Sequence, residues 1–174
     1  MHEIAFWADD AEPPGPDAAP MSSWSTHTNV SGTPDDVIAV LSDPDSIRRW
    51  APIDFAVDGI DGDRLESGTR ARVSGRLAGR SASFEVDVEQ AEEGRFALTA
   101  SGPIDLDVEY EAFETTGNET EVWATVSVKG GGLVGRLLAQ ATDALLAAGA
   151  LDRALGRIAS EIEATAGSGM ALAA

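Results

Sequence analysis

The chain has 174 residues, 43% of them hydrophobic and 24% charged, which is the composition of a globular protein and not of a disordered one. Its 30 acidic residues against 12 Lys and Arg give a net charge of −18, which disfavours nucleic acid and anionic membrane surfaces as partners. With no cysteine and two histidines, we expect no disulfide, no metal site and no cofactor.

Both ends of the chain differ in composition from its middle. Residues 1–21 combine several prolines with acids and alanines, so we expect a disordered N-terminal tail. Its apolar exceptions, left open as a docking segment, are Ile4, Phe6 and Trp7. Residues 166–174 are expected to form a frayed C-terminal tail, which leaves one domain over residues 22–165. No basic segment leads into an apolar stretch, and no run of 18 apolar residues occurs, so we expect a cytoplasmic protein without a membrane span.

The domain is predicted to begin with a strand and two short helices. Residues 24–31 alternate in polarity, as a half-buried strand does. Thr33-Pro34 then supplies a helix N-cap followed by a proline at the first helical position. Asp43-Pro44 ends this helix and starts a second one, which carries Trp50.

Six further strands are predicted, over residues 54–58, 69–77, 80–90, 95–101, 104–113 and 121–129. A two-residue turn at Ala78-Gly79 pairs Val73 with Phe84 on the apolar face of a hairpin. The same register places Arg72 opposite Glu85, and Arg70 opposite Asp87, on its polar face. Because these strands have one apolar face, something must cover that side of the sheet.

The predicted cover is a single C-terminal helix over residues 133–164, with a candidate kink at Gly149. At about 1.5 Å per residue it would extend roughly 48 Å, enough to cross a whole sheet. Its apolar positions recur with helical spacing and are Val134, Leu137, Leu138, Ala141, Leu145, Ala148, Leu151, Leu155, Ile158 and Ile162.

This order of elements resembles the helix-grip fold of the START and polyketide-cyclase superfamily (SRPBCC). The resemblance rests on Thr33-Pro34-Asp35-Asp36-Val37, Leu41-Ser42-Asp43-Pro44, Trp50-Ala51-Pro52, Gly68-Thr69 and the glycine-rich approach to the last helix. It covers roughly residues 22–165. It implies an α+β fold in which a curved seven-stranded antiparallel sheet wraps around a long C-terminal helix, with two short helices after the first strand.

The resemblance also implies a function. Members of the superfamily hold lipids, sterols, polyketides or hormones between sheet and helix, and some catalyse cyclisation or dehydration there. The segment from Gly131 to Leu137 is similar to the branch of the superfamily that is associated with carbon monoxide dehydrogenase. That branch implies a third role, as an accessory interaction module of a larger enzyme.

Small residues on the inward faces, such as Ala71, Gly75 and Ala100, predict an interior that side chains do not fill. We therefore expect an apolar pocket of roughly 300–700 Å³. The expected ligand-binding residues are Trp50, Val73, Phe84, Val86, Leu98, Leu106, Val108, Tyr110, Ala124, Val126, Leu138, Ala141 and Leu145. No catalytic residue is assigned, but the single tyrosine, Tyr110, is a candidate hydrogen-bond donor or general acid.

Three other motifs are interpreted structurally. Gly130–Gly135 fits G-x-G-x-x-G, but no strand follows the helix, so a hinge is favoured over a dinucleotide site. Asp61-Gly62-Asp63 starts like a calcium loop and then lacks the later ligands, which favours a solvated turn. His27 falls on the outward face of its strand.

Arginines offer two further sets of candidate ligand contacts. The four arginines over residues 70–80 face cross-strand acids, which favours surface ion pairs over an acidic ligand. Arg48 and Arg49 lie beside Trp50 at the expected mouth of the cavity and are the better candidates.

Two main functions remain open: binding or transport of a small hydrophobic molecule such as a lipid or polyketide, and a polyketide aromatase/cyclase or dehydratase. Proton transfer needs titratable groups, and the inward faces offer few: Tyr110, with Asp54 and Arg48 as further candidates. Binding without catalysis is therefore preferred. The sequence sets neither the ligand nor the oligomeric state.

Overall fold

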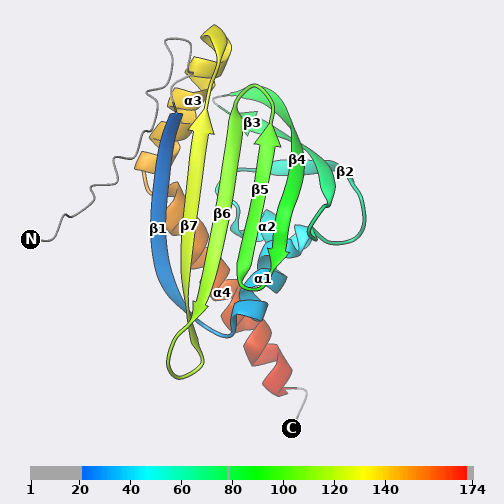
Figure 1. The fold of residues 1–174 in the computed structure, drawn as a ribbon, viewed down its shortest axis with the longest axis vertical. Coiled ribbons are helices and arrows are strands. Elements are labelled where there is room, and N and C mark those ends of the chain that lie inside the picture. Colours follow the sequence, from blue (N-terminus) through cyan, green and yellow to red (C-terminus); the bar gives the residue numbers. More distant parts are fainter. Residues whose placement is uncertain (1–20, 78, 172–174) are drawn as a thin grey trace, which may run out of the picture.

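The computed structural model describes residues 21–77 and 79–171 (Figure 1). Its elements are β1 (Met21–Ser31), α1 (Pro34–Ser42), α2 (Pro44–Trp50), β2 (Phe55–Ile60), β3 (Arg70–Leu77), β4 (Arg80–Glu92), β5 (Arg95–Ser101), β6 (Asp105–Glu114), β7 (Glu119–Lys129), α3 (Gly132–Ala147) and α4 (Ala150–Ala171). Apart from Met21, which belongs to β1, the expected N-terminal tail with Ile4, Phe6 and Trp7 lies outside the described residues.

The seven strands form one antiparallel sheet in the order β1-β7-β6-β5-β4-β3-β2. Figure 1 shows the curved sheet in front and α1, α2 and α4 behind it, so one face is covered and the other is open. This arrangement confirms the predicted α+β helix-grip fold, with two short helices after the first strand.

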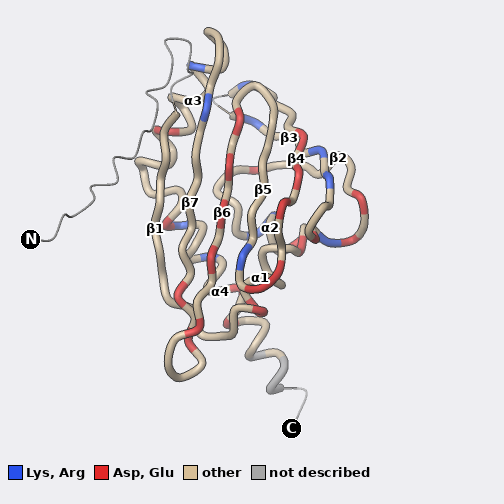
Figure 2. Tube along the Cα trace, viewed as in Figure 1, with Lys and Arg blue, Asp and Glu red and all other residues tan. Residues whose placement is uncertain are grey.

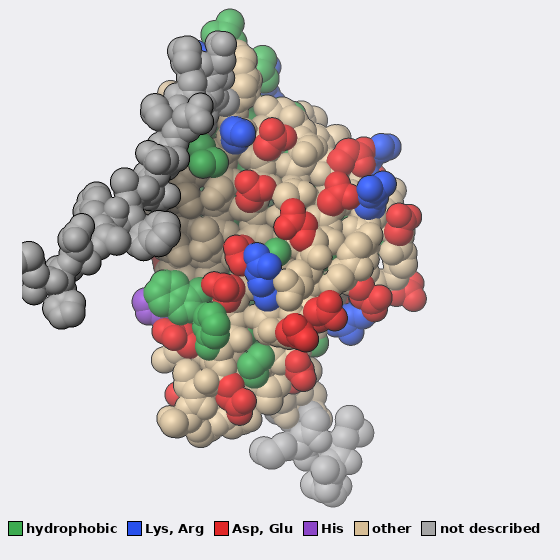
Figure 3. Space-filling view, viewed as in Figure 1, with side chains coloured by type: hydrophobic (Ala, Val, Ile, Leu, Met, Phe, Trp, Pro, Cys, Tyr) green, Lys and Arg blue, Asp and Glu red, His purple; other side chains and the backbone are tan. Residues whose placement is uncertain are grey.

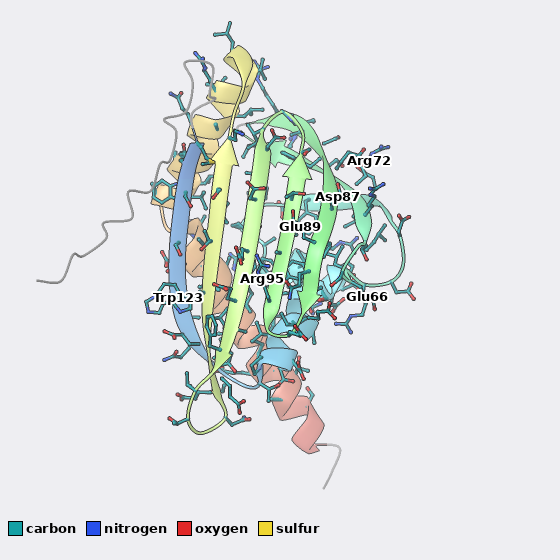
Figure 4. All side chains as sticks on the ribbon, viewed as in Figure 1. Glu66, Arg72, Asp87, Glu89, Arg95 and Trp123 are labelled. Carbon is teal, nitrogen blue, oxygen red and sulfur yellow. The ribbon has the colours of Figure 1, made fainter. Side chains whose placement is uncertain are left out.

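The predicted hairpin register is confirmed. Val73 lies opposite Phe84, Arg72 opposite Glu85 and Arg70 opposite Asp87. Figure 4 shows Arg72, Asp87 and Glu89 on the face of the sheet turned away from the helices. Acidic residues recur along β4 and β6 (Figure 2), and the apolar residues between them pack in the core.

Local sequence also sets the two short helices. The Thr33 hydroxyl accepts a hydrogen bond from the Asp36 amide, and the Asp36 carboxylate accepts one from the Thr33 amide, which closes a capping box. Asp43 caps α2 in turn. Burial disfavours the charge on Asp43, but hydrogen bonds from the Ser46 hydroxyl and neighbouring amides outweigh it and lower the pKa of this carboxyl. Trp50, at the end of α2, is buried in the core.

The C-terminal cover differs from the prediction, because two helices stand where one was expected. Gly149, at φ +81°, separates α3 from α4, and the Ala148 amide closes the end of α3 on the Ala144 carbonyl. Gly149 was the predicted kink, and it is a full break. Helix α4 continues to Ala171, so residues 166–171 of the expected C-terminal tail are helical.

The inward face of α3 also differs from the prediction. The α4 positions Leu151, Leu155, Ile158 and Ile162 are buried as expected. In α3, however, Val134 and Leu137 are 55% and 52% exposed. The helix approaches other backbone closely at Gly135: a Cβ there would lie 2.9 Å from the Pro103 carbonyl oxygen, so α3 turns its glycine side toward the turn between β5 and β6.

Because Gly135 lies so close to other backbone, two Gly→Ala substitutions in helices are expected to change the stability of the protein in opposite directions. Gly135→Ala is expected to destabilise the protein by about 1–3 kcal/mol, because backbone must move to admit the methyl group. Gly156→Ala in α4 is expected to stabilise it by about 0.5–1 kcal/mol, since no neighbour lies within 4 Å of the new Cβ. Urea denaturation measures both, and equal stabilisation by the two would contradict the described position of α3.

Candidate ligand-binding cavity

A cavity of about 320 Å³ lies between the inner face of the sheet and the helices. Strands β2 to β7 supply most of its wall, α2 contributes Ile47 and Trp50, and α4 contributes Leu151 and Ala154. Helix α3 reaches it only through its last turns, at Thr142, Leu145 and Leu146. The volume falls at the lower end of the predicted range.

Most of the expected ligand-binding residues meet at this cavity. Ten line it: Trp50, Val73, Phe84, Val86, Leu98, Leu106, Val108, Tyr110, Val126 and Leu145. The other three expected residues do not line the cavity; they are Ala124, Leu138 and Ala141. Helix α4 packs onto β1 and β7, which closes the space over Ala124, and Leu138 is buried on the side of α3 that lies against the sheet.

Sequence reasoning missed the side of the cavity formed by β2 and the segment before it. There the wall is made by Pro52, Ile53, Phe55, Val57 and Ile60. The alternation of Phe55 and Val57 within the predicted strand is the sequence signal for them. The hollow is therefore displaced toward the β2–β3 end of the sheet, because α4 covers the β1–β7 end tightly.

The exposed wall of the cavity is almost entirely carbon. Tyr110 is 4% exposed, and burial raises the pKa of its hydroxyl, which stays protonated at neutral pH. Its ring meets the Trp50 ring edge-on, with centroids 6.0 Å apart. The Trp50 indole nitrogen is buried and, among the described residues, has no hydrogen-bond partner. Such a wall suits the apolar part of a guest.

Other candidate residues lie away from the cavity. His27 stacks on Trp123 on the outer face, with ring centroids 4.4 Å apart. Figure 3 shows that many acidic side chains lie on that face. Arg48 and Arg49, expected at the mouth, instead pair with Asp45 and Glu161 and do not line the cavity.

Other kinds of site find no support in the part of the chain that the structure describes. The Gly130–Gly135 segment leads into α3, and no strand follows that helix among the described residues. Within residues 21–77 and 79–171, no group of His, Asp and Glu is arranged to hold a metal ion. No helix of those ranges is long and apolar enough to cross a membrane.

Comparison with known protein families gives a match over most of the chain. A sequence model of the family described as polyketide cyclase/dehydrase and lipid transport matches residues 21–163. A comparison with curated proteins gives no match.

Several solved structures share the fold at low sequence identity. The Zhui aromatase/cyclase from Streptomyces sp. R1128 has a TM-score of 0.64 at 16% identity, over 83% of this chain and 94% of that one. A START superfamily protein from Mycobacterium smegmatis has a TM-score of 0.57 at 17% identity, over 78% and 96%. Norcoclaurine synthase from Thalictrum flavum, in complex with dopamine and hydroxybenzaldehyde, has a TM-score of 0.59 at 12% identity, over 83% and 88%.

Proposed function

Since the chain belongs to the polyketide cyclase/dehydrase and lipid transport family, we propose that it binds a small hydrophobic molecule in its cavity, as a carrier or sensor. The observation that carries this proposal is the carbon-lined hollow of about 320 Å³. An apolar guest that leaves water for this hollow gains about 25 cal/mol per Å² of buried apolar surface. A cytoplasmic location and the absence of nucleic-acid partners stay predictions.

The chemistry of the wall favours binding over catalysis. Cyclisation and dehydration move protons between carbon and oxygen, which requires groups that exchange protons near neutral pH. The titratable side chains at the cavity are Tyr110, whose raised pKa keeps it protonated, and Arg76, whose guanidinium has donors and no acceptor. Neither is a general base at neutral pH.

A fluorescent guest tests the proposal. The dye 1-aminoanthracene is uncharged and emits more strongly in apolar surroundings, so titrating it into the protein reports occupation of the cavity. We expect saturable binding at one site per chain and displacement of the dye by dodecan-1-ol. No saturable binding would refute the proposal and would favour the accessory interaction module.

An aromatase/cyclase or dehydratase is the second candidate, because Tyr110 on the cavity wall is a potential proton donor and the family description includes both activities. The binding proposal predicts that a poly-β-ketone thioester mimic reacts at its uncatalysed rate with both the wild type and Tyr110→Phe. Product analysis by chromatography decides between the two functions. Acceleration by the wild type that falls about 100-fold or more in Tyr110→Phe would establish the enzyme instead.

A further inference from the structure

A polar groove continues outward from the cavity. It runs between residues 51–56, the end of β3 and helix α4, and we call it the mouth groove. Six residues line both the cavity and the mouth groove: Pro52, Ile53, Phe55, Ser74, Gly75 and Arg76. The cavity and the mouth groove therefore share part of their walls.

The mouth groove carries positive charge on an acidic protein. Arg76 from β3 and Arg157 from α4 line it, and Asp54 is the acidic residue of its wall. Two cations and one anion give a local charge of +1, against −18 for the whole chain. The Arg157 guanidinium donates a hydrogen bond to the Ala51 carbonyl oxygen at 3.1 Å, which holds it over the groove.

Neither guanidinium forms an ion pair with a carboxylate among the described residues. In that part of the chain, no carboxylate lies within ion-pair distance of Arg76 or Arg157. Two other arginines of the same strand differ, because Arg70 pairs with Asp87 and Arg72 with Glu85. Although the chain is rich in carboxylates, these two guanidiniums thus have no carboxylate partner among the described residues.

We propose that the guest of the cavity is an amphiphile with an anionic oxygen head group, a carboxylate or a phosphate. Its apolar chain fills the cavity, and its head group lies in the mouth groove between Arg76 and Arg157. Guanidinium groups bind such oxyanions through charge-assisted hydrogen bonds. The distant acidic residues oppose this weakly, because the Debye length is about 8 Å at physiological ionic strength. The inference rests on the proposed function and adds the chemical class of the guest.

The first experiment displaces 1-aminoanthracene with dodecanoate, dodecyl phosphate or dodecan-1-ol, which share one chain length. We expect at least one of the two anions to bind about tenfold or more tightly than the alcohol, and the better anion identifies the head group. The double variant Arg76→Gln/Arg157→Gln is expected to bind the preferred anion about tenfold or more weakly than the wild type does. Its affinity for the alcohol is expected to stay within twofold of the wild-type affinity.

Arg70→Gln/Arg72→Gln is the matched control, because it removes the same charge from β3 at positions that line neither the cavity nor the mouth groove. We expect it to leave the affinity for the anions within twofold. Equal loss in both double variants would overturn the inference, and so would equal affinity of the wild type for the alcohol and both anions. Displacement by the alcohol alone would leave the proposed function intact, whereas absence of dye binding would remove the proposed function itself.

A salt titration of the wild type tests the inference without any substitution. Raising NaCl to about 1 M shortens the Debye length to about 3 Å. The affinity for the anion that binds better, relative to the affinity for dodecan-1-ol, is then expected to fall several-fold. A ratio that salt leaves unchanged would contradict a head group bound by the two arginines.

Discussion

Ala100→Phe is expected to lower the affinity for 1-aminoanthracene at least tenfold while the protein stays folded. Ala100 lies on β5 with Val86 and Leu106 on either side, and all three line the cavity. A phenyl ring at this position occupies space that the guest needs. A tenfold loss corresponds to about 1.4 kcal/mol of binding free energy. Fluorescence titration measures the affinity, and the thermal unfolding midpoint reports whether the fold is kept.

The control for this substitution lies one residue away. Thr99 is on the outer face of the same strand, so Thr99→Phe adds a similar ring without entering the cavity. We expect dye affinity within twofold of the wild type. Val73→Trp provides a second way to fill the cavity from β3. Undiminished binding in folded Ala100→Phe and Val73→Trp would show that the dye binds elsewhere.

Leu155→Ala is expected to cost about 2–5 kcal/mol of unfolding free energy. Leu155 is 2% exposed and lies on the face of α4 that packs under the sheet. Truncating it removes buried methyl groups and leaves a void in a core that cannot collapse fully. Urea denaturation followed by circular dichroism measures the change.

The same substitution on α3 is the matched comparison. Leu133 is 89% exposed, so Leu133→Ala is expected to change the unfolding free energy by less than about 0.5 kcal/mol. A large loss at Leu133 together with a small one at Leu155 would mean that α3, and not α4, is the helix that the sheet grips.

Local patterns predicted much of the fold. The β3–β4 register followed from residues close in sequence, because Val73 can meet Phe84 only when Arg72 meets Glu85. The start of α1 followed from Thr33 and Pro34, whose effects act within one helical turn. Each of these features depends on neighbours in the chain, so the sequence was sufficient to predict them.

The remaining features depend on contacts between distant segments. The exposed side of α3 is set where Gly135 meets the Pro103 backbone, a contact that helical periodicity does not contain. The absence of Ala124 from the cavity wall depends on how closely α4 approaches β1 and β7. The mouth groove likewise joins Arg76 to Arg157 across more than half of the domain, and no sequence motif links them.

Native mass spectrometry tests the central claim most directly. The wild type and Ala100→Phe are each incubated with dodecan-1-ol, exchanged into volatile buffer and weighed intact. The account predicts one bound molecule per wild-type chain and the bare mass for Ala100→Phe. An unmodified mass for the wild type, or the same adduct on both proteins, would contradict a guest held between the sheet and its helices.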